Sequence, residues 1–116
     1  SAHDKAGKGG GSIILTENPE EAAADADVLY TDVWASMGQE SERSNRETAF
    51  ADYQINSALV KLAKTKAVIM HCLPAYRGRE ITDEVMDSSQ SVVFQQAENR
   101  LHSQRALLEV LLGRRR

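Results

Sequence analysis

Four side chains in this sequence could carry chemistry, namely Asp32, His71, Cys72 and Arg100. A carboxylate can bind an ammonium group, an ionised thiol can accept a proton, and a guanidinium can hold an anion through charge-assisted hydrogen bonds. An adjacent His–Cys pair can also suggest a metal site. Neighbouring strand residues point to opposite faces, however, so the pair serves one metal ion poorly. The residue types therefore favour acid–base and anion chemistry over metal chemistry.

Each of these residues also has a purely structural explanation when taken alone. An aspartate after a strand commonly caps a helix or forms a turn, and a single cysteine is commonly a small buried hydrophobic side chain. Arg100 stands in the first turns of a predicted helix, where the helix dipole disfavours a cation. A neighbouring carboxylate such as Glu98, or a bound anion, would explain that position.

The apolar runs of the sequence predict the strands that would position these residues. The expected strands are 28–31, 67–70 and 91–94, with a short fourth candidate at 13–15. Polar blocks follow the first three, so Asp32, Cys72 and Arg100 would meet at the carboxyl edge of one sheet, where α/β proteins bind ligands. Strands that alternate with helices predict an α/β fold with a mainly parallel sheet.

Periodicity and end signals predict the intervening helices. Pro19 follows an asparagine at a helix start, Thr82 is a candidate N-cap, and Gly113 suits a C-terminal stop. The expected helical segments are 19–26, 40–53, 55–62, 82–87 and 97–113. Residues 1–12 are polar and glycine-rich, and they form either a flexible linker or the end of a helix with its exit turn.

The bulk composition excludes several classes of protein. The chain has 116 residues, of which 41% are hydrophobic and 27% charged, as in ordinary globular domains. The formal charge of -3 does not indicate the positive surface that binds nucleic acid. The terminal arginines 114–116 fit a solvated helix end. Cys72 is the only cysteine, and no apolar run reaches the ~20 residues of a membrane span, so we expect a cytoplasmic protein.

Three blocks taken together resemble the signature motifs of the ornithine carbamoyltransferases, in both order and spacing. The blocks are DVWASMGQE at 32–40, HCLPAYRG at 71–78 and AENR at 97–100. The similarity extends from about Ile13 to Leu112. It implies a partial doubly wound parallel sheet, a Rossmann-like ornithine-binding domain truncated at its N-terminus, with residues 13–116 as that domain and 1–12 as its lead-in.

The resemblance implies transfer of a carbamoyl group from carbamoyl phosphate to the side-chain amine of ornithine, without a metal or organic cofactor. The implied ornithine-binding residues are Asp32, Ser36, Met37 and Cys72. The implied carbamoyl phosphate-binding residues are His71, Cys72, Leu73 and Arg100, and the implied catalytic residues are Cys72 and Arg100. The substrate amine, with an ordinary pKa near ~10.4, must lose a proton before attack, and either a thiolate or a carboxylate could accept it.

The same residues bear on the choice of substrate. Cys72 and the loop at 36–38 favour ornithine over aspartate by resemblance, and the pairing of Asp32 with Ser36 favours a free α-amino acid over putrescine or N-acetylornithine.

The resemblance also concerns what the chain lacks. We find no Ser-Thr-Arg-Thr block and no His-Pro-x-Gln block, which in the family belong to the carbamoyl phosphate-binding half. We therefore expect this chain to be inactive and only marginally stable by itself, and to act within a homotrimer or a multiple of trimers. A non-catalytic amino-acid-binding or assembly module, or a general α/β interaction domain, would be the alternative.

Overall fold

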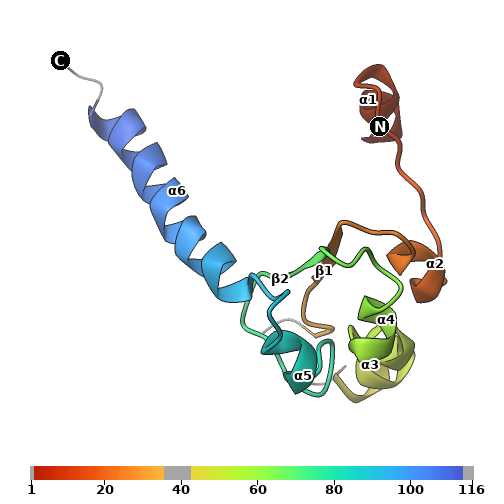
Figure 1. Cartoon of the computed structure of the whole chain (residues 1–116). Helices are drawn as coiled ribbons and strands as arrows, with labels where there is room; N and C mark the ends of the chain where they lie inside the picture. The colour runs from red at the N-terminus through yellow and green to blue at the C-terminus, as the bar shows by residue number, and fades with distance from the viewer. Residues whose placement is uncertain (1, 36–42, 114–116) are drawn as a thin grey trace.

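A two-stranded parallel sheet lies between the helices in the computed structural model, which describes residues 2–35 and 43–113 (Figure 1). Strand β1 spans Val28–Thr31 and strand β2 spans Val68–His71, and their register places Val28 opposite Val68 and Thr31 opposite His71. The helices are α1 Ala2–Lys8, α2 Pro19–Ala23, α3 Arg43–Phe50, the 3₁₀ turn η2 Ala51–Tyr53, α4 Ser57–Val60, α5 Asp83–Met86 and α6 Val93–Gly113.

The sheet buries one face more completely than the other. Leu29 and Ile69 are register partners, and both are buried with His71 on the face that meets the core. Tyr30 lies on the opposite face and is 55% exposed. The core contains apolar side chains from several elements: Ala23, Leu29, Ile55, Ile69, Ile81, Val85, Met86 and Val93. The alternation of side chains along each strand thus separates a core face from an open face.

The expectation of an α/β fold with a parallel sheet is confirmed, but two of the predicted strands are wrong. Ser91 makes only a single parallel bridge to Ile69, and helix α6 begins at Val93. The Gln96 N–H already donates to the Val92 carbonyl, because the strong helix formers after Phe94 extend the helix backwards over the β-branched pair. Residues 13–15 form no strand, and within the described part of the chain no strand pairs with them.

Two of the predicted helix starts, at Pro19 and at Thr82, are confirmed by their caps. The Asn18 carboxamide accepts from the Glu20 and Glu21 amides, and the Thr82 hydroxyl accepts from the Val85 amide. The segment predicted at 55–62 is shorter than expected. Ile55 instead bridges to Ile81, and only Ser57–Val60 is helical after the Asn56 cap.

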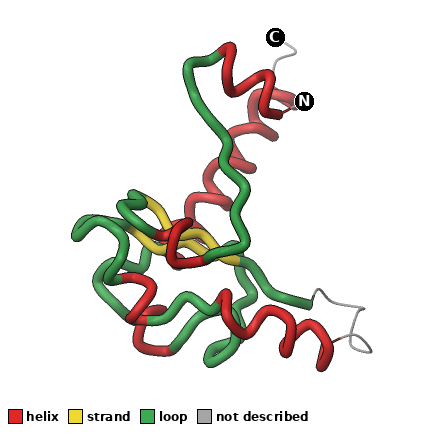
Figure 2. Tube along the Cα trace, turned by 90° about the vertical axis from the view of Figure 1, so that its right-hand side faces the viewer, coloured by secondary structure: helices red, strands yellow, loops and turns green. Residues whose placement is uncertain are grey.

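Two helices extend away from this body. Helix α6 projects from the sheet in both views, and an extended segment joins helix α1 to the rest of the chain (Figures 1 and 2). The radius of gyration of 17.2 Å therefore exceeds the ~13 Å of a compact domain of this length. For the first residues the structure shows a helix followed by a glycine turn rather than a linker. Among the described residues, no helix combines the length and the hydropathy needed to cross a membrane.

Candidate active site

The sheet register brings Asp32 and Cys72 together. Thr31 is paired with His71 in the last position of the two strands, so the next residue of each strand emerges at the same carboxyl edge. The Cys72 thiol donates a hydrogen bond to Asp32 Oδ1 at 3.0 Å, and the Val33 amide donates to the same oxygen at 2.7 Å. Residues 40 positions apart in sequence thus form a carboxylate–thiol pair at the edge where α/β sheets bind ligands.

The electrostatics of this pair assign the negative charge to Asp32. The hydrogen bond from Cys72, followed by that from the Val33 amide, lowers the pKa of the Asp32 carboxyl. The hydrogen bond to Asp32 is also the main cause that raises the pKa of the Cys72 thiol, and burial and the Asp32 charge add to it. The Arg100 charge acts in the opposite direction and favours the thiolate. At neutral pH the resting pair is therefore a carboxylate and a neutral thiol.

This assignment predicts how fast Cys72 is alkylated. Asp32→Asn removes the charge and the strong acceptor, so the thiol pKa should fall and iodoacetamide should react faster at pH ~7.5, since the thiolate is the nucleophile. Arg100→Ala should raise the thiol pKa and slow the reaction. Peptide-resolved mass spectrometry of Cys72 measures both rates, and equal rates in all three proteins would contradict the assignment.

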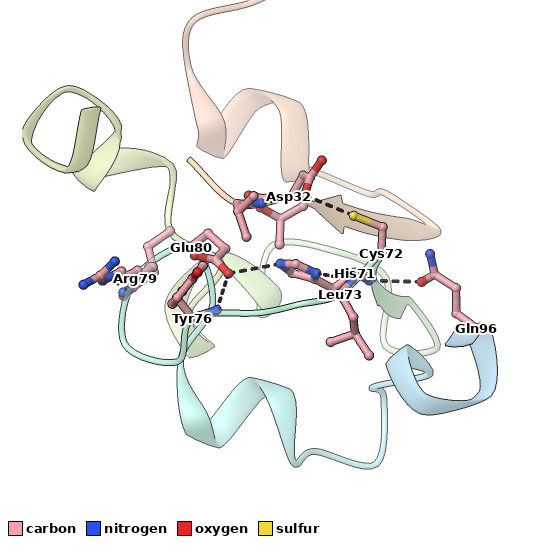
Figure 3. A network of polar contacts seen from close by, with 11 residues as sticks. Asp32, His71, Cys72, Leu73, Tyr76, Arg79, Glu80 and Gln96 are labelled. Carbon is pink, nitrogen blue, oxygen red and sulfur yellow. Dashed lines mark hydrogen bonds and ion pairs between the residues drawn. The ribbon is translucent and has the colours of Figure 1, made fainter. Parts of the chain in front are cut away.

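His71 lies beside this pair but faces the core. Its ring is fully buried, with Nδ1 accepting from the Leu73 amide at 2.9 Å and Nε2 lying 3.1 Å from Glu80 Oε1 (Figure 3). The His71 main-chain amide donates to Gln96 Oε1 at 3.1 Å. The ring thus uses both nitrogens within the protein, and a contact between His71 and carbamoyl phosphate stays a prediction.

Two polar residues of this network were not among the predicted site residues. Glu80 is 1% exposed, and its Oε1 accepts from the Tyr76 amide at 2.6 Å as well as lying against the His71 ring. Gln96 lies in the first turn of α6, accepts from the His71 amide and donates to the Tyr30 hydroxyl at 2.8 Å. Gln96 therefore links the start of α6 to both strands. The position of Gln96 just after a predicted strand could have indicated a site residue. Glu80 stands in a loop whose sequence gives no such indication.

The other predicted site residues are distributed as follows. Leu73 follows Cys72 directly, and its backbone adopts φ 56°. Arg100 is exposed on α6 and influences the Cys72 thiol through its charge. Ser36 and Met37 lie outside the described residues. The structure thus brings Asp32 and Cys72 into contact, and the charge of Arg100 acts on the Cys72 thiol from α6.

A separate hollow on the described surface does not coincide with this site. It lies along α6 and has a volume of about 670 Å³. Its lining is Leu101, Gln104, Arg105, Leu108, Glu109, Leu112 and Gly113. The hollow is an open, apolar helix face without the carboxylate, thiol or buried histidine of the strand edge, and we place the candidate site at the strand edge.

The two parallel strands end at a carboxylate–thiol pair, and the helix beside them carries an arginine. This arrangement is that of a ligand-binding domain of the α/β class. The chain belongs to the aspartate/ornithine carbamoyltransferase family, because the model of its Asp/Orn binding domain matches residues 1–111. This confirms the family expected from the three sequence blocks.

Individual relatives agree with this assignment. The ornithine carbamoyltransferase of Thermococcus kodakarensis is 54% identical over 112 residues, which cover 97% of this chain and 36% of that protein. The solved structure of ornithine carbamoyltransferase from Pyrococcus furiosus superposes with a TM-score of 0.90 at 53% identity, covering 99% of this chain and 37% of that one. A solved acetylornithine transcarbamylase, complexed with acetylcitrulline, gives a TM-score of 0.80 at 32% identity over 95% of this chain and 34% of its own. The chain thus spans about a third of the length of the relatives that it matches.

Proposed function

We propose that this chain is the ornithine-binding part of an ornithine carbamoyltransferase. The complete enzyme would transfer the carbamoyl group of carbamoyl phosphate to the side-chain amine of ornithine and release citrulline and phosphate. The observation that carries this proposal is the Asp32–Cys72 pair at the carboxyl edge of the parallel strands, 3.0 Å apart, in a chain of this family.

Asp32 is the anion that attracts the cationic groups of ornithine. Its lowered carboxyl pKa keeps it ionised throughout the neutral range, and its exposure leaves it accessible to a ligand. The neutral Cys72 thiol lies beside it, where the reacting amine would be placed. An ammonium group bound there would favour the thiolate, because a nearby positive charge stabilises the ionised form.

The transfer then needs a free amine and a stabilised leaving phosphate. The amine nitrogen bonds to the carbamoyl carbon as the bond from that carbon to the phosphate oxygen breaks, and the proton that the amine loses passes to the Cys72 thiolate or to the Asp32 carboxylate. Arg100 would hold the oxygen on which negative charge develops. Leu73 and His71 would face carbamoyl phosphate, and Ser36 and Met37 would bind the amino-acid end of ornithine, as the resemblance implies.

A second candidate substrate is N-acetylornithine, which the likeness to the acetylornithine transcarbamylase structure brings into consideration. An exposed carboxylate at Asp32 favours a substrate that keeps its free α-amino group, because acetylation removes the positive charge that the carboxylate would pair with. Ornithine is therefore the substrate that the site supports better. A trimeric assembly and a cytoplasmic location also belong to this proposal.

A chimera tests the proposed function. The matched 112 residues of the Thermococcus kodakarensis relative would be replaced by the corresponding residues of this chain. We expect citrulline from ornithine and carbamoyl phosphate, little product from N-acetylornithine or putrescine, and no product from the relative lacking the segment. A folded chimera that makes no citrulline would contradict the proposal and favour a non-catalytic module.

A further inference from the structure

Glu80 is a buried carboxylate within the loop that follows the candidate catalytic cysteine. Its side chain is 1% exposed, and Oε1 accepts from the Tyr76 amide at 2.6 Å and lies 3.1 Å from His71 Nε2. Burying a carboxylate is unfavourable unless hydrogen bonds compensate for the lost water. The loop therefore retains an unfavourable group whose partners lie close to the site.

The hydrogen bonds fix which His71 nitrogen carries the proton. The Leu73 amide donates to Nδ1, so Nδ1 has no proton to donate. Nε2 then carries the proton of the neutral ring and donates it to Glu80. Glu80 thus selects the only neutral tautomer of His71 that can accept from Leu73.

The Leu73 amide connects the hydrogen-bonded Glu80–His71 pair to the candidate site. Leu73 directly follows Cys72, and its φ of 56° lies in the left-handed region that a branched side chain disfavours. A strained backbone conformation of this kind persists only when the surrounding structure stabilises it, and such conformations are common at functional sites. The hydrogen bond from the Leu73 amide to His71 Nδ1 stabilises this conformation, one residue from the Cys72 thiol.

We propose that Glu80 is a positioning residue for carbamoyl transfer, acting through the His71 ring to hold the Cys72–Leu73 main chain in its left-handed conformation at the site. Glu80 does not touch substrate. The relay runs from the Glu80 carboxylate to the ring and from the ring to the Leu73 amide. This inference rests on the proposed function, since positioning is measured through the reaction.

Two substitutions of His71 in the chimera separate positioning from stability. In His71→Asn the Oδ1 atom can take the place of Nδ1 and accept from Leu73, but the donor to Glu80 is lost. In His71→Gln the side chain reaches Glu80 and the acceptor for Leu73 is lost. We expect both variants to lose rate, because His71 is itself a predicted carbamoyl phosphate-binding residue. We expect kcat of His71→Gln to fall about 100-fold further than kcat of His71→Asn, the size of effect that a 1 Å misplacement can have.

The melting temperatures of the two His71 variants should rank in the opposite order to their kcat values. His71→Asn leaves the buried Glu80 carboxylate without the ring donor, so its melting temperature should fall further than that of His71→Gln. Rates are measured per folded molecule at saturating substrates. A kcat order that follows the melting temperatures would overturn the proposal, because Glu80 and His71 would then be structural only.

A second pair acts on Glu80 itself. Glu80→Gln keeps an acceptor oxygen for the Tyr76 amide and the ring, whereas Glu80→Leu keeps none. We expect kcat within about threefold for Glu80→Gln and a loss of about 100-fold for Glu80→Leu. Equal kcat values in the two variants would overturn the proposal. An inactive parent chimera would instead overturn the proposed function, so the two failures are distinguishable.

Discussion

Asp32→Asn is expected to lower kcat/KM for ornithine in the chimera by about 10³-fold, within the range of acid–base and charge contributions at active sites. The change keeps the size of the side chain and removes the charge that the lowered pKa of the Asp32 carboxyl maintains at neutral pH. It also weakens the acceptor of the Cys72 hydrogen bond. Steady-state citrulline assays with ornithine varied at saturating carbamoyl phosphate measure the loss.

Asp27→Asn is the matched control for this substitution. Asp27 immediately precedes β1 at the opposite end of the strand, where its carboxylate lies 2.7 Å from Lys64 Nζ at the surface. The same change of charge should leave the rate within about twofold, since exposed ion pairs contribute little. A similar loss in both variants would show that net charge, rather than the site, accounts for the effect.

The sequence could predict the position of Asp32 and Cys72 because both lie one residue beyond a parallel strand. Strand β1 was predicted with its observed bounds and β2 to within one residue. Once the strands are parallel and in register, the residues that follow them emerge side by side. Side-chain type and strand periodicity together were therefore sufficient for this part of the site.

The buried network could not be predicted in the same way. Glu80 stands in a charged loop, Arg77-Gly78-Arg79-Glu80, where a solvated side chain is the ordinary expectation. Its main chain is held by a contact distant in sequence, since Ile55 bridges to Ile81 and the Ile55 amide donates to the Glu80 carbonyl. That contact joins two segments that lack strand periodicity. The local hydrophobic pattern of the sequence therefore could not predict the contact.

The wrong third strand shows a different limit. Val92, Val93 and Phe94 favour a strand by their side chains, but Val93 and Phe94 are the first two residues of the 21-residue helix α6. Only the bridge from Ser91 to Ile69 keeps the parallel arrangement. Because a strand of four residues and the first turn of a helix compete for the same segment, the longer helical tract decides. Arg100 consequently lies in the third turn of α6 rather than near its start.

Arg100→Ala is expected to lower kcat by about 10²–10³-fold, the cost of removing one donor to a developing oxyanion. Arg100 is exposed on α6, and its positive charge already acts on the Cys72 thiol, so it lies within electrostatic reach of the reacting groups. Its loss should also raise KM for carbamoyl phosphate more than KM for ornithine. Arg100→Lys should recover only part of the rate, because an ammonium lacks the planar fork of the guanidinium.

Arg105→Ala provides the comparison on the same helix. Arg105 lies about one and a half turns further along α6, where its Nε donates to Glu109 at 2.9 Å on the exposed surface. A role for Arg100 in helix stability alone predicts similar, small losses for both alanine variants, since an exposed arginine contributes little. A role at the site predicts the large loss only for Arg100, together with slower alkylation of Cys72 in that variant. The two measurements depend on the same charge, so a loss of kcat without slower alkylation would place Arg100 near the carbamoyl phosphate but remove it from the neighbourhood of the thiol.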